Sequence, residues 1–125
     1  MILLTVEEVM ALHKKLIERT GGSDGLRDQS LLESAVYSAM TEFEGSEAYP
    51  TVQEKAARLM FALTNNHAFV DGNKRIGVFV MLMTLQLNNV KIKYTQSELI
   101  SLGLSVAEGT TRYEEILTWI QEREM

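Results

Sequence analysis

Residues 67–75 read His-Ala-Phe-Val-Asp-Gly-Asn-Lys-Arg, and they lie between two helical patterns that dominate the chain. Before them, residues 52–63 have the apolar spacing of an amphipathic helix. After them, residues 76–87 are apolar at nine of twelve positions, which suits a helix buried on most sides. The stretch is therefore predicted to be a loop that opens a central helix. No other segment brings together so many reactive groups: an imidazole, a carboxylate, an amide and two cations.

The start of this central helix is predicted to bind an anion. A helix N-terminus presents unpaired backbone N–H groups and the positive end of the helix dipole. Gly72 would let the backbone approach a ligand closely, and Gly72 and Asn73 are expected to shape the anion site through their N–H groups. Lys74 and Arg75 place cations where the dipole mildly disfavours them, which a bound phosphate would explain. A solvated pair of cations is the alternative.

The same stretch offers the other groups that phosphoryl transfer requires. Asp71 is a hard oxygen ligand of the kind that holds Mg²⁺ together with substrate phosphates, although the same position would also suit a helix N-cap. His67, at the end of the preceding helix, is the candidate general base for an incoming hydroxyl. Phe69 is interpreted as a core anchor of the loop. His13 is interpreted as a packed histidine, because no other reactive group lies near it in the sequence.

The remaining sequence predicts an all-α domain of five to six helices without internal repeats. Capping boxes starting at Thr5, Thr51, Thr95 and Thr111 mark helix starts, and Asp28 or Ser30 is expected to cap a further helix. Residues 41–50 read as a loop or a short hairpin. After the central helix, which ends near residues 88–89, helices are expected near 96–108 and 112–123. The chain of 125 residues fits one domain, 1–125.

Composition limits the class of protein and its location. The chain has no cysteine, which excludes a disulfide framework and a cysteine-based zinc site. Its beginning lacks the pattern of a signal peptide and its longest apolar run is too short for a membrane span, so a cytoplasmic protein is expected. The net charge of −5 argues against direct nucleic-acid binding. Residues 54–93 nevertheless carry six Lys and Arg against two Asp and Glu, which fits a small anionic ligand.

The stretch resembles the signature of the Fic/Doc superfamily, His-x-Phe-x-Asp/Glu-Gly-Asn-Gly/Lys-Arg, at every defined position from His67 to Arg75. Residues 26–35 and 49–57 are also similar to the Doc branch, so the resemblance covers nearly the whole chain. It implies about six helices around a buried central helix, with a flap near residues 41–50 that helps to align a target polypeptide. It also implies ATP as co-substrate and Mg²⁺ as its metal.

Two positions decide which branch of the superfamily the chain resembles. Lys74 stands where most members have glycine, and Val78 stands where the fuller Fic pattern has a second arginine. Lysine in the motif is similar to the Doc branch, the toxins of Phd–Doc-type toxin–antitoxin pairs. This implies transfer of the terminal phosphate of ATP to a hydroxyl of a protein, namely elongation factor Tu, and inhibition by a Phd-like antitoxin, because the chain lacks the self-inhibitory motif of many Fic proteins.

Three other functions remain open at this stage. A Fic-type AMP transferase is disfavoured by Lys74 and Val78. A non-catalytic module that only binds an antitoxin is disfavoured by the intact His67 and Asp71. A metal hydrolase is the weakest alternative, because His13 and His67 are the only histidines and the spacing of a metal site is missing.

Overall fold

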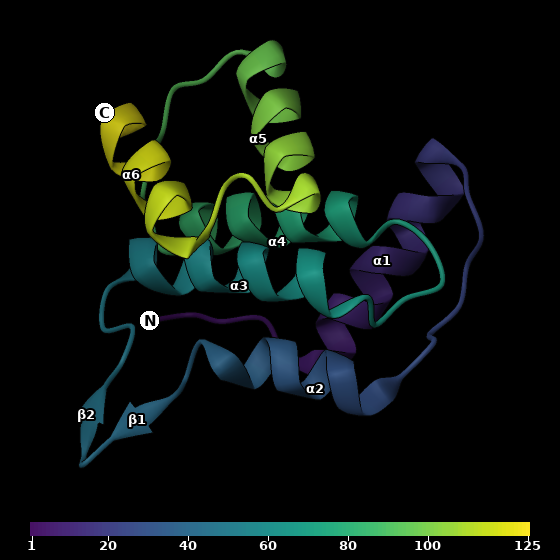
Figure 1. Ribbon diagram of the computed structural model, residues 1–125, viewed down its shortest axis with the longest axis horizontal. Helices are drawn as coiled ribbons and strands as arrows, with labels where there is room; N and C mark the ends of the chain where they lie inside the picture. Colours follow the sequence, from purple (N-terminus) through teal and green to yellow (C-terminus); the bar gives the residue numbers. More distant parts are fainter.

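The computed structural model describes residues 1–125 as six helices and one small hairpin (Figure 1). This confirms the all-α prediction and the number of helices. In chain order the elements are α1 (Val6–Thr20), α2 (Gln29–Ser38), β1 (Glu42–Phe43), β2 (Ser46–Glu47), α3 (Val52–Asn66), α4 (Asn73–Leu87), α5 (Gln96–Glu108) and α6 (Tyr113–Arg123).

Side-chain caps explain where most of these helices begin. Thr5, Thr51 and Thr95 form the predicted capping boxes at the starts of α1, α3 and α5. Asp28, rather than Ser30, caps α2 by accepting the N–H of Leu31.

One predicted cap and one predicted helix start differ from the structure, for different reasons. The box at Thr111 does not open α6: its N-cap is Arg112, and the Thr111 hydroxyl donates to Ser105 on α5 instead. The central helix α4 begins at Asn73 and not at residue 76. Its first turn is polar, so the apolar pattern could not reveal it. The cations Lys74 and Arg75 therefore lie within the helix.

The central pair of helices is α3 and α4, which lie side by side through the middle of the molecule (Figure 1). Their close approach depends on Gly77 of α4. A Cβ atom there would collide with the Thr64 hydroxyl and would lie 3.1 Å from the carbonyl oxygen of Met60, both on α3. The motif loop joins the two helices at one end of this pair, so their packing fixes the distance between the end of α3 and the start of α4.

Apolar side chains on either side of this pair form two clusters. One cluster joins α3 and α4 to α1 and α2, and its largest fully buried members are Leu32, Leu63 and Ile76. The other joins them to α5 and α6 and includes Met60, Met81, Leu85, Ile116 and Ile120. The two helices that flank the motif loop, α3 and α4, are therefore both anchored in a closely packed core.

The hairpin of β1 and β2 projects from one corner of the molecule (Figure 1). Of the two alternatives for residues 41–50, a loop or a short hairpin, the structure has the hairpin. Its base is held by Lys55 of α3, whose side chain is buried. The Lys55 ammonium donates to the carboxylate of Glu47 at 2.8 Å, to the carbonyl of Tyr49 at 2.6 Å and to the carbonyl of Ala39 at 3.2 Å. One cation thus joins the end of α2, strand β2 and the approach to α3.

None of the helices combines the length and the apolar character that a membrane crossing would require.

Candidate active site

His67 ends α3 in the left-handed conformation, with φ 52° and ψ 46°. This conformation is uncommon for a residue other than glycine, so other contacts must hold it. One of them is the Arg27 Nε, which donates to the His67 carbonyl oxygen at 2.7 Å. The chain leaves α3 at this residue and turns toward α4, and the exposed His67 side chain lines the cavity described below.

The loop after His67 is held by the segment that precedes α2. The carbonyl oxygen of Ala68 accepts the N–H groups of Arg27 and Asp28 at 2.8 and 3.0 Å, and the N–H of Val70 donates to the Gly25 carbonyl at 3.0 Å. Ala68 and Phe69 are buried, which confirms Phe69 as a core anchor. Sequence reasoning did not find this support, because an irregular pairing between distant loops leaves no periodic signal.

Asn73 fixes the width of the loop with its side chain. Its Oδ1 accepts the N–H of Phe69 and its Nδ2 donates to the Phe69 carbonyl, both at 3.0 Å. The amide therefore satisfies both backbone groups of one residue, which an aspartate could not do. Because the side-chain amide is used in this way, only the backbone N–H of Asn73 is free to contact an anion.

Asp71 presents its carboxylate beside the start of α4. Its Oδ2 accepts the N–H of Ser23 at 3.1 Å, and its Oδ1 accepts the N–H of Gly72 at 2.8 Å. The Arg75 guanidinium lies 3.6 Å from Oδ1. These two N–H donors, led by that of Ser23, and then the charge of Arg75 lower the pKa of Asp71 from its ordinary value. The group is therefore a carboxylate at neutral pH and retains lone pairs that face solvent.

Helix α4 begins without a side-chain cap. Gly72 is its N-cap in the left-handed conformation, with φ 77°, and supplies no capping group. The N–H groups of residues 73–75 have no acceptor within the protein. Three unpaired backbone N–H groups and the positive end of the helix dipole therefore lie together at the start of α4.

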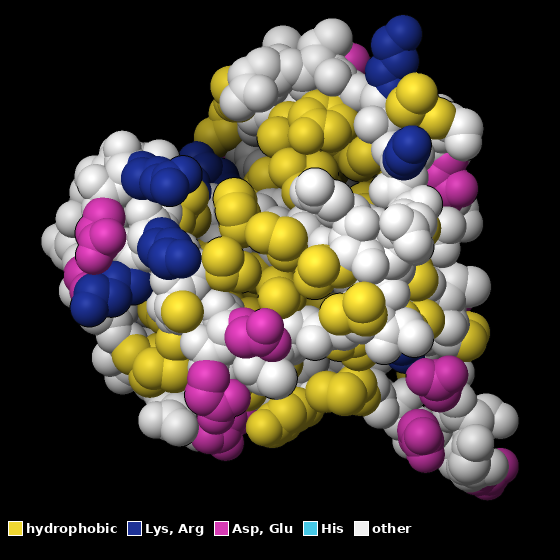
Figure 2. All heavy atoms as spheres, turned by 180° about the vertical axis from the view of Figure 1, so that it is seen from behind, with side chains coloured by type: hydrophobic (Ala, Val, Ile, Leu, Met, Phe, Trp, Pro, Cys, Tyr) yellow, Lys and Arg dark blue, Asp and Glu magenta, His cyan; other side chains and the backbone are white.

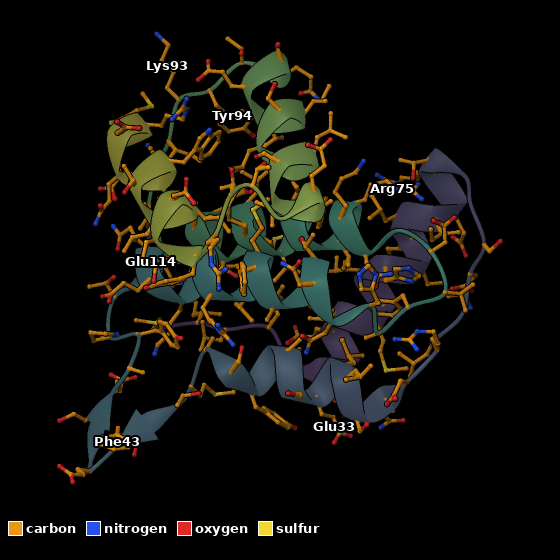
Figure 3. The ribbon with its side chains drawn as sticks, viewed as in Figure 1. Glu33, Phe43, Arg75, Lys93, Tyr94 and Glu114 are labelled. Carbon is orange, nitrogen blue, oxygen red and sulfur yellow. The ribbon has the colours of Figure 1, made fainter.

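The two cations of the first turn differ in their contacts. Lys74 is exposed, and its aliphatic stem crosses Gly103 of α5, where a Cβ would lie 3.5 Å from the Lys74 Cγ. Arg75 reaches the end of α1, where its Nη1 donates to the Thr20 hydroxyl at 2.6 Å and to the Gly21 carbonyl at 2.8 Å. In Figure 3, Arg75 lies between the start of α4, which carries it, and the end of α1.

The six residues predicted to act as base, metal ligand or phosphate contact all line one cavity of about 350 Å³. They are His67, Asp71, Gly72, Asn73, Lys74 and Arg75, and Thr64, Val70 and Ala107 complete the wall. The cavity therefore brings together an imidazole, an ionised carboxylate, unpaired backbone N–H groups and two cations. Such a set can accept a proton from a hydroxyl and can hold a phosphate group.

The chemistry of the donors fits a magnesium ion that a nucleotide shares with the protein. No group of three or more His, Cys, Asp or Glu side chains is placed to hold a metal ion. Mg²⁺ in nucleotide sites commonly takes one or two carboxylates and completes its shell with phosphate oxygens and water. Asp71 would be the carboxylate ligand in this cavity.

Two residues near the site were missed or undervalued in the sequence. Ser23 contacts Asp71 only through its backbone, so its identity carries no signal. His13 is packed, as predicted, but it packs against the motif itself. Its ring stacks on Phe69 with centroids 3.7 Å apart, and its Nε2 lies 2.7 Å from the Asp71 carbonyl oxygen. The only indication of this packing in the sequence is that His13 is an isolated polar residue beside the apolar stripe of α1.

Comparison with known proteins finds a matching family and two similar proteins. Residues 3–85 match the model of the Fic/DOC family. Toxin Doc of Mycolicibacterium smegmatis (strain ATCC 700084 / mc(2)155) is 40% identical over 72 residues, which cover 58% of this chain and 55% of that protein. Protein kinase doc of Escherichia phage P1 is 30% identical over 106 residues, which cover 85% of this chain and 82% of that protein. The chain thus matches only about half of the length of the first of these relatives.

Proposed function

Because the chain belongs to the Fic/DOC family, we propose that it is a Doc-like toxin that transfers the terminal phosphate of ATP to a hydroxyl of a protein. The observation that carries the proposal is the shared cavity. In it, the His67 imidazole and the Asp71 carboxylate lie beside an uncapped helix start that carries Lys74 and Arg75. When bound with Mg²⁺, ATP would supply the phosphoryl group and leave as ADP.

Each residue has a defined task in this proposal. His67 accepts the proton of the target hydroxyl. Asp71 stays ionised, because its hydrogen bonds lower its pKa, and would hold Mg²⁺. The N–H groups of residues 73–75 orient phosphate oxygens, and Lys74 and Arg75 compensate the negative charge. Catalysis would then arise from positioning and electrostatic stabilisation, as is usual for phosphoryl transfer.

The surroundings of Lys74 favour terminal-phosphate transfer over AMP transfer. The Lys74 stem is packed against Gly103, so its bulk and charge stand where most members of the superfamily have a glycine. Val78, at the position of the second arginine, is packed against the same glycine, since a Cβ there would lie 3.2 Å from its Cγ2. The second cation of an AMP-transferring site is therefore missing. AMP transfer remains the alternative within the enzyme class.

The proposed partner is a Phd-like antitoxin, encoded as a separate chain. An apolar groove of about 360 Å³ runs between α1, α4 and α5 and meets the cavity at Lys74 and Arg75. Its hydrophobic lining consists of Leu16, Val78, Phe79, Leu82, Leu99 and Ile100. Figure 2 shows apolar side chains gathered over the middle of this face, with Lys and Arg side chains on the side of α1. Such a surface suits an amphipathic helix with acidic residues that folds as it binds.

A transfer assay with ATP labelled at the terminal phosphate, and separately at the α-phosphate, tests the function. Elongation factor Tu is the target proposed first, because the resemblance to the Doc branch implies it. We expect the terminal label to be transferred, and His67→Ala to reduce the rate by roughly 10²–10⁴. Lys74→Ala should also reduce it, whereas Lys93→Ala, which removes an exposed lysine far from the site, should not (Figure 3).

Other outcomes identify the alternatives. Transfer of the α-label would favour the AMP transferase. A folded protein that binds the nucleotide and transfers neither label would favour the non-catalytic module. In cells, expression of the protein alone should arrest growth, and the arrest should be relieved by His67→Ala or by the small partner encoded beside it.

A further inference from the structure

We propose that His13 of α1 is a positioning residue for the phosphotransfer, which holds the peptide unit between Asp71 and Gly72 so that the Asp71 carboxylate faces the cavity. The inference rests on the proposed function for its effect on catalysis. Its structural part stands on the contacts of His13 alone. His13 does not line the cavity, so it acts through Asp71 and not on the substrate.

The imidazole occupies a confined space beneath the motif loop. Its side chain is 1% exposed. The ring stacks on Phe69 at an interplanar angle of 9°, and a Cβ on Gly72 would lie 3.5 Å from its Nε2. The ring thus contacts the motif loop both at Phe69 and at Gly72.

The hydrogen bond from His13 has one possible direction. A carbonyl oxygen can only accept, so the His13 Nε2 carries a hydrogen and donates it to the Asp71 carbonyl at 2.7 Å. The carbonyl belongs to the peptide unit whose N–H, on Gly72, donates to the Asp71 Oδ1 at 2.8 Å. The same peptide unit is therefore held by His13 at its oxygen and by the Asp71 carboxylate at its nitrogen.

This arrangement couples the orientation of the peptide plane to that of the carboxylate. If the plane rotates, the Gly72 N–H no longer points at Oδ1, and the carboxylate loses one of its two backbone donors. The other donor, Ser23 N–H, belongs to the loop after α1. Helix α1, through His13, and the loop that follows it, through Ser23, therefore set where the proposed magnesium ligand points. An apolar residue at position 13 would fill the space but would leave the Asp71 carbonyl without its donor.

Three variants separate this role from simple packing. His13→Phe keeps an aromatic ring against Phe69 and removes the donor. His13→Gln keeps a donor on a side chain of similar reach. Ile17→Val is the matched control, because Ile17 is a buried residue of the same helix that also contacts Gly72, where a Cβ would lie 3.0 Å from its Cδ1, but it makes no hydrogen bond to the loop. His13→Met serves as a second variant without a donor if His13→Phe does not fold.

The first measurement is amide hydrogen exchange of Gly72 in the protein without nucleotide, corrected for the global stability of each variant. We expect exchange to be roughly 10-fold faster in His13→Phe, and close to the original protein in His13→Gln and Ile17→Val. The second is the affinity for Mn²⁺ in the presence of ATP, followed by electron paramagnetic resonance. It should weaken by roughly 10-fold or more in His13→Phe, as is typical when a residue that orients a metal ligand is lost, and recover in His13→Gln.

Opposite results have distinct meanings. If Gly72 exchange and Mn²⁺ affinity in His13→Phe equal those of the original protein, His13 only fills space and the proposal is wrong. The same conclusion follows if Ile17→Val changes them as much as His13→Phe does. If the protein transfers no phosphate to any target but Gly72 exchange behaves as expected, the proposed function fails while the positioning of Asp71 by His13 stands.

Discussion

Lys55 is expected to hold the hairpin of β1 and β2 to the body of the protein, and Lys55→Met tests this. Methionine is similar in length to lysine and carries no donor. The substitution removes three hydrogen bonds at once, to the Glu47 carboxylate and to the carbonyls of Tyr49 and Ala39. The lysine side chain is 4% exposed and the glutamate side chain 48% exposed. The cost therefore falls mainly on the two carbonyls and not on the glutamate, which water can solvate.

The magnitude follows from two opposed effects. A buried acceptor left without a donor costs about 1–3 kcal/mol, and the Tyr49 carbonyl, which is only partly buried, contributes at the low end. Removing the ammonium also relieves the cost of burying a charge, which offsets part of the loss. We expect a net decrease in the free energy of unfolding of about 1–3 kcal/mol. For a chain of this length this lowers the Tm by roughly 5–10 °C.

The assay combines thermal unfolding with amide exchange in the hairpin. Exchange of the Ala48 N–H, which donates to Thr41 at 2.8 Å, should accelerate beyond the change in global stability. Lys91→Met, at an exposed lysine, is the control and should change neither quantity. If the hairpin aligns the target polypeptide, the KM for the protein target should rise while the KM for ATP stays constant. An unchanged Tm together with unchanged Ala48 exchange would refute the idea that Lys55 anchors the hairpin.

Three further outcomes are expected. Gly103→Ala should leave the Tm within a few degrees, because a gain in helix propensity of roughly 0.5–1 kcal/mol offsets crowding against Val78. Phosphate transfer should stay close to that of the original protein, because the new methyl group would lie in ordinary contact with the stem of Lys74, 3.5 Å from its Cγ. Burial, followed by the charge of Glu54, raises the pKa of Tyr113 from 10.0 to about 12, so the free energy of unfolding should fall as pH rises through this window. Tyr113→Phe should make the accompanying fall in Tm smaller. The pKa of Asp71 is lowered, so its small contribution to the free energy of unfolding is present above pH 3.8 and is lost as pH falls through the lowered pKa. Asp71→Asn should therefore make the Tm depend less on pH on the acid side.

The helices could be predicted from the sequence because their signals are local. Thr5, Thr51 and Thr95 each bond to the glutamate three residues later, so the capping pattern and the bond are contained in four residues. The start of α4 was predicted too late because a polar first turn that faces a ligand cavity has no apolar periodicity. Arg112 shows the limit of the capping signal, because the pattern at Thr111 was present but its hydroxyl found a partner on α5.

The candidate site was predictable in its residues but not in its supports. His67 and Asp71 were identified from the chemistry of one short stretch, and both line the cavity. The contacts that hold them come from Arg27, Ser23 and His13, which lie 40 or more residues earlier in the chain. No spacing rule connects such residues, because their proximity arises only once α1 and α2 have packed against α3 and α4.

A motif of this kind therefore does not by itself define a working site. The strain of a left-handed residue such as His67 persists only where the surroundings fix it, and the Arg27 side chain is one of the groups that hold its carbonyl. The Asp71 carboxylate depends in the same way on His13 and Ser23. A chain with an intact motif but altered residues at positions 13 and 27 would keep the signature and lose these two side-chain contacts. Because these supports belong to α1 and to the segment between α1 and α2, the N-terminal part of the chain should decide activity as strongly as the motif does.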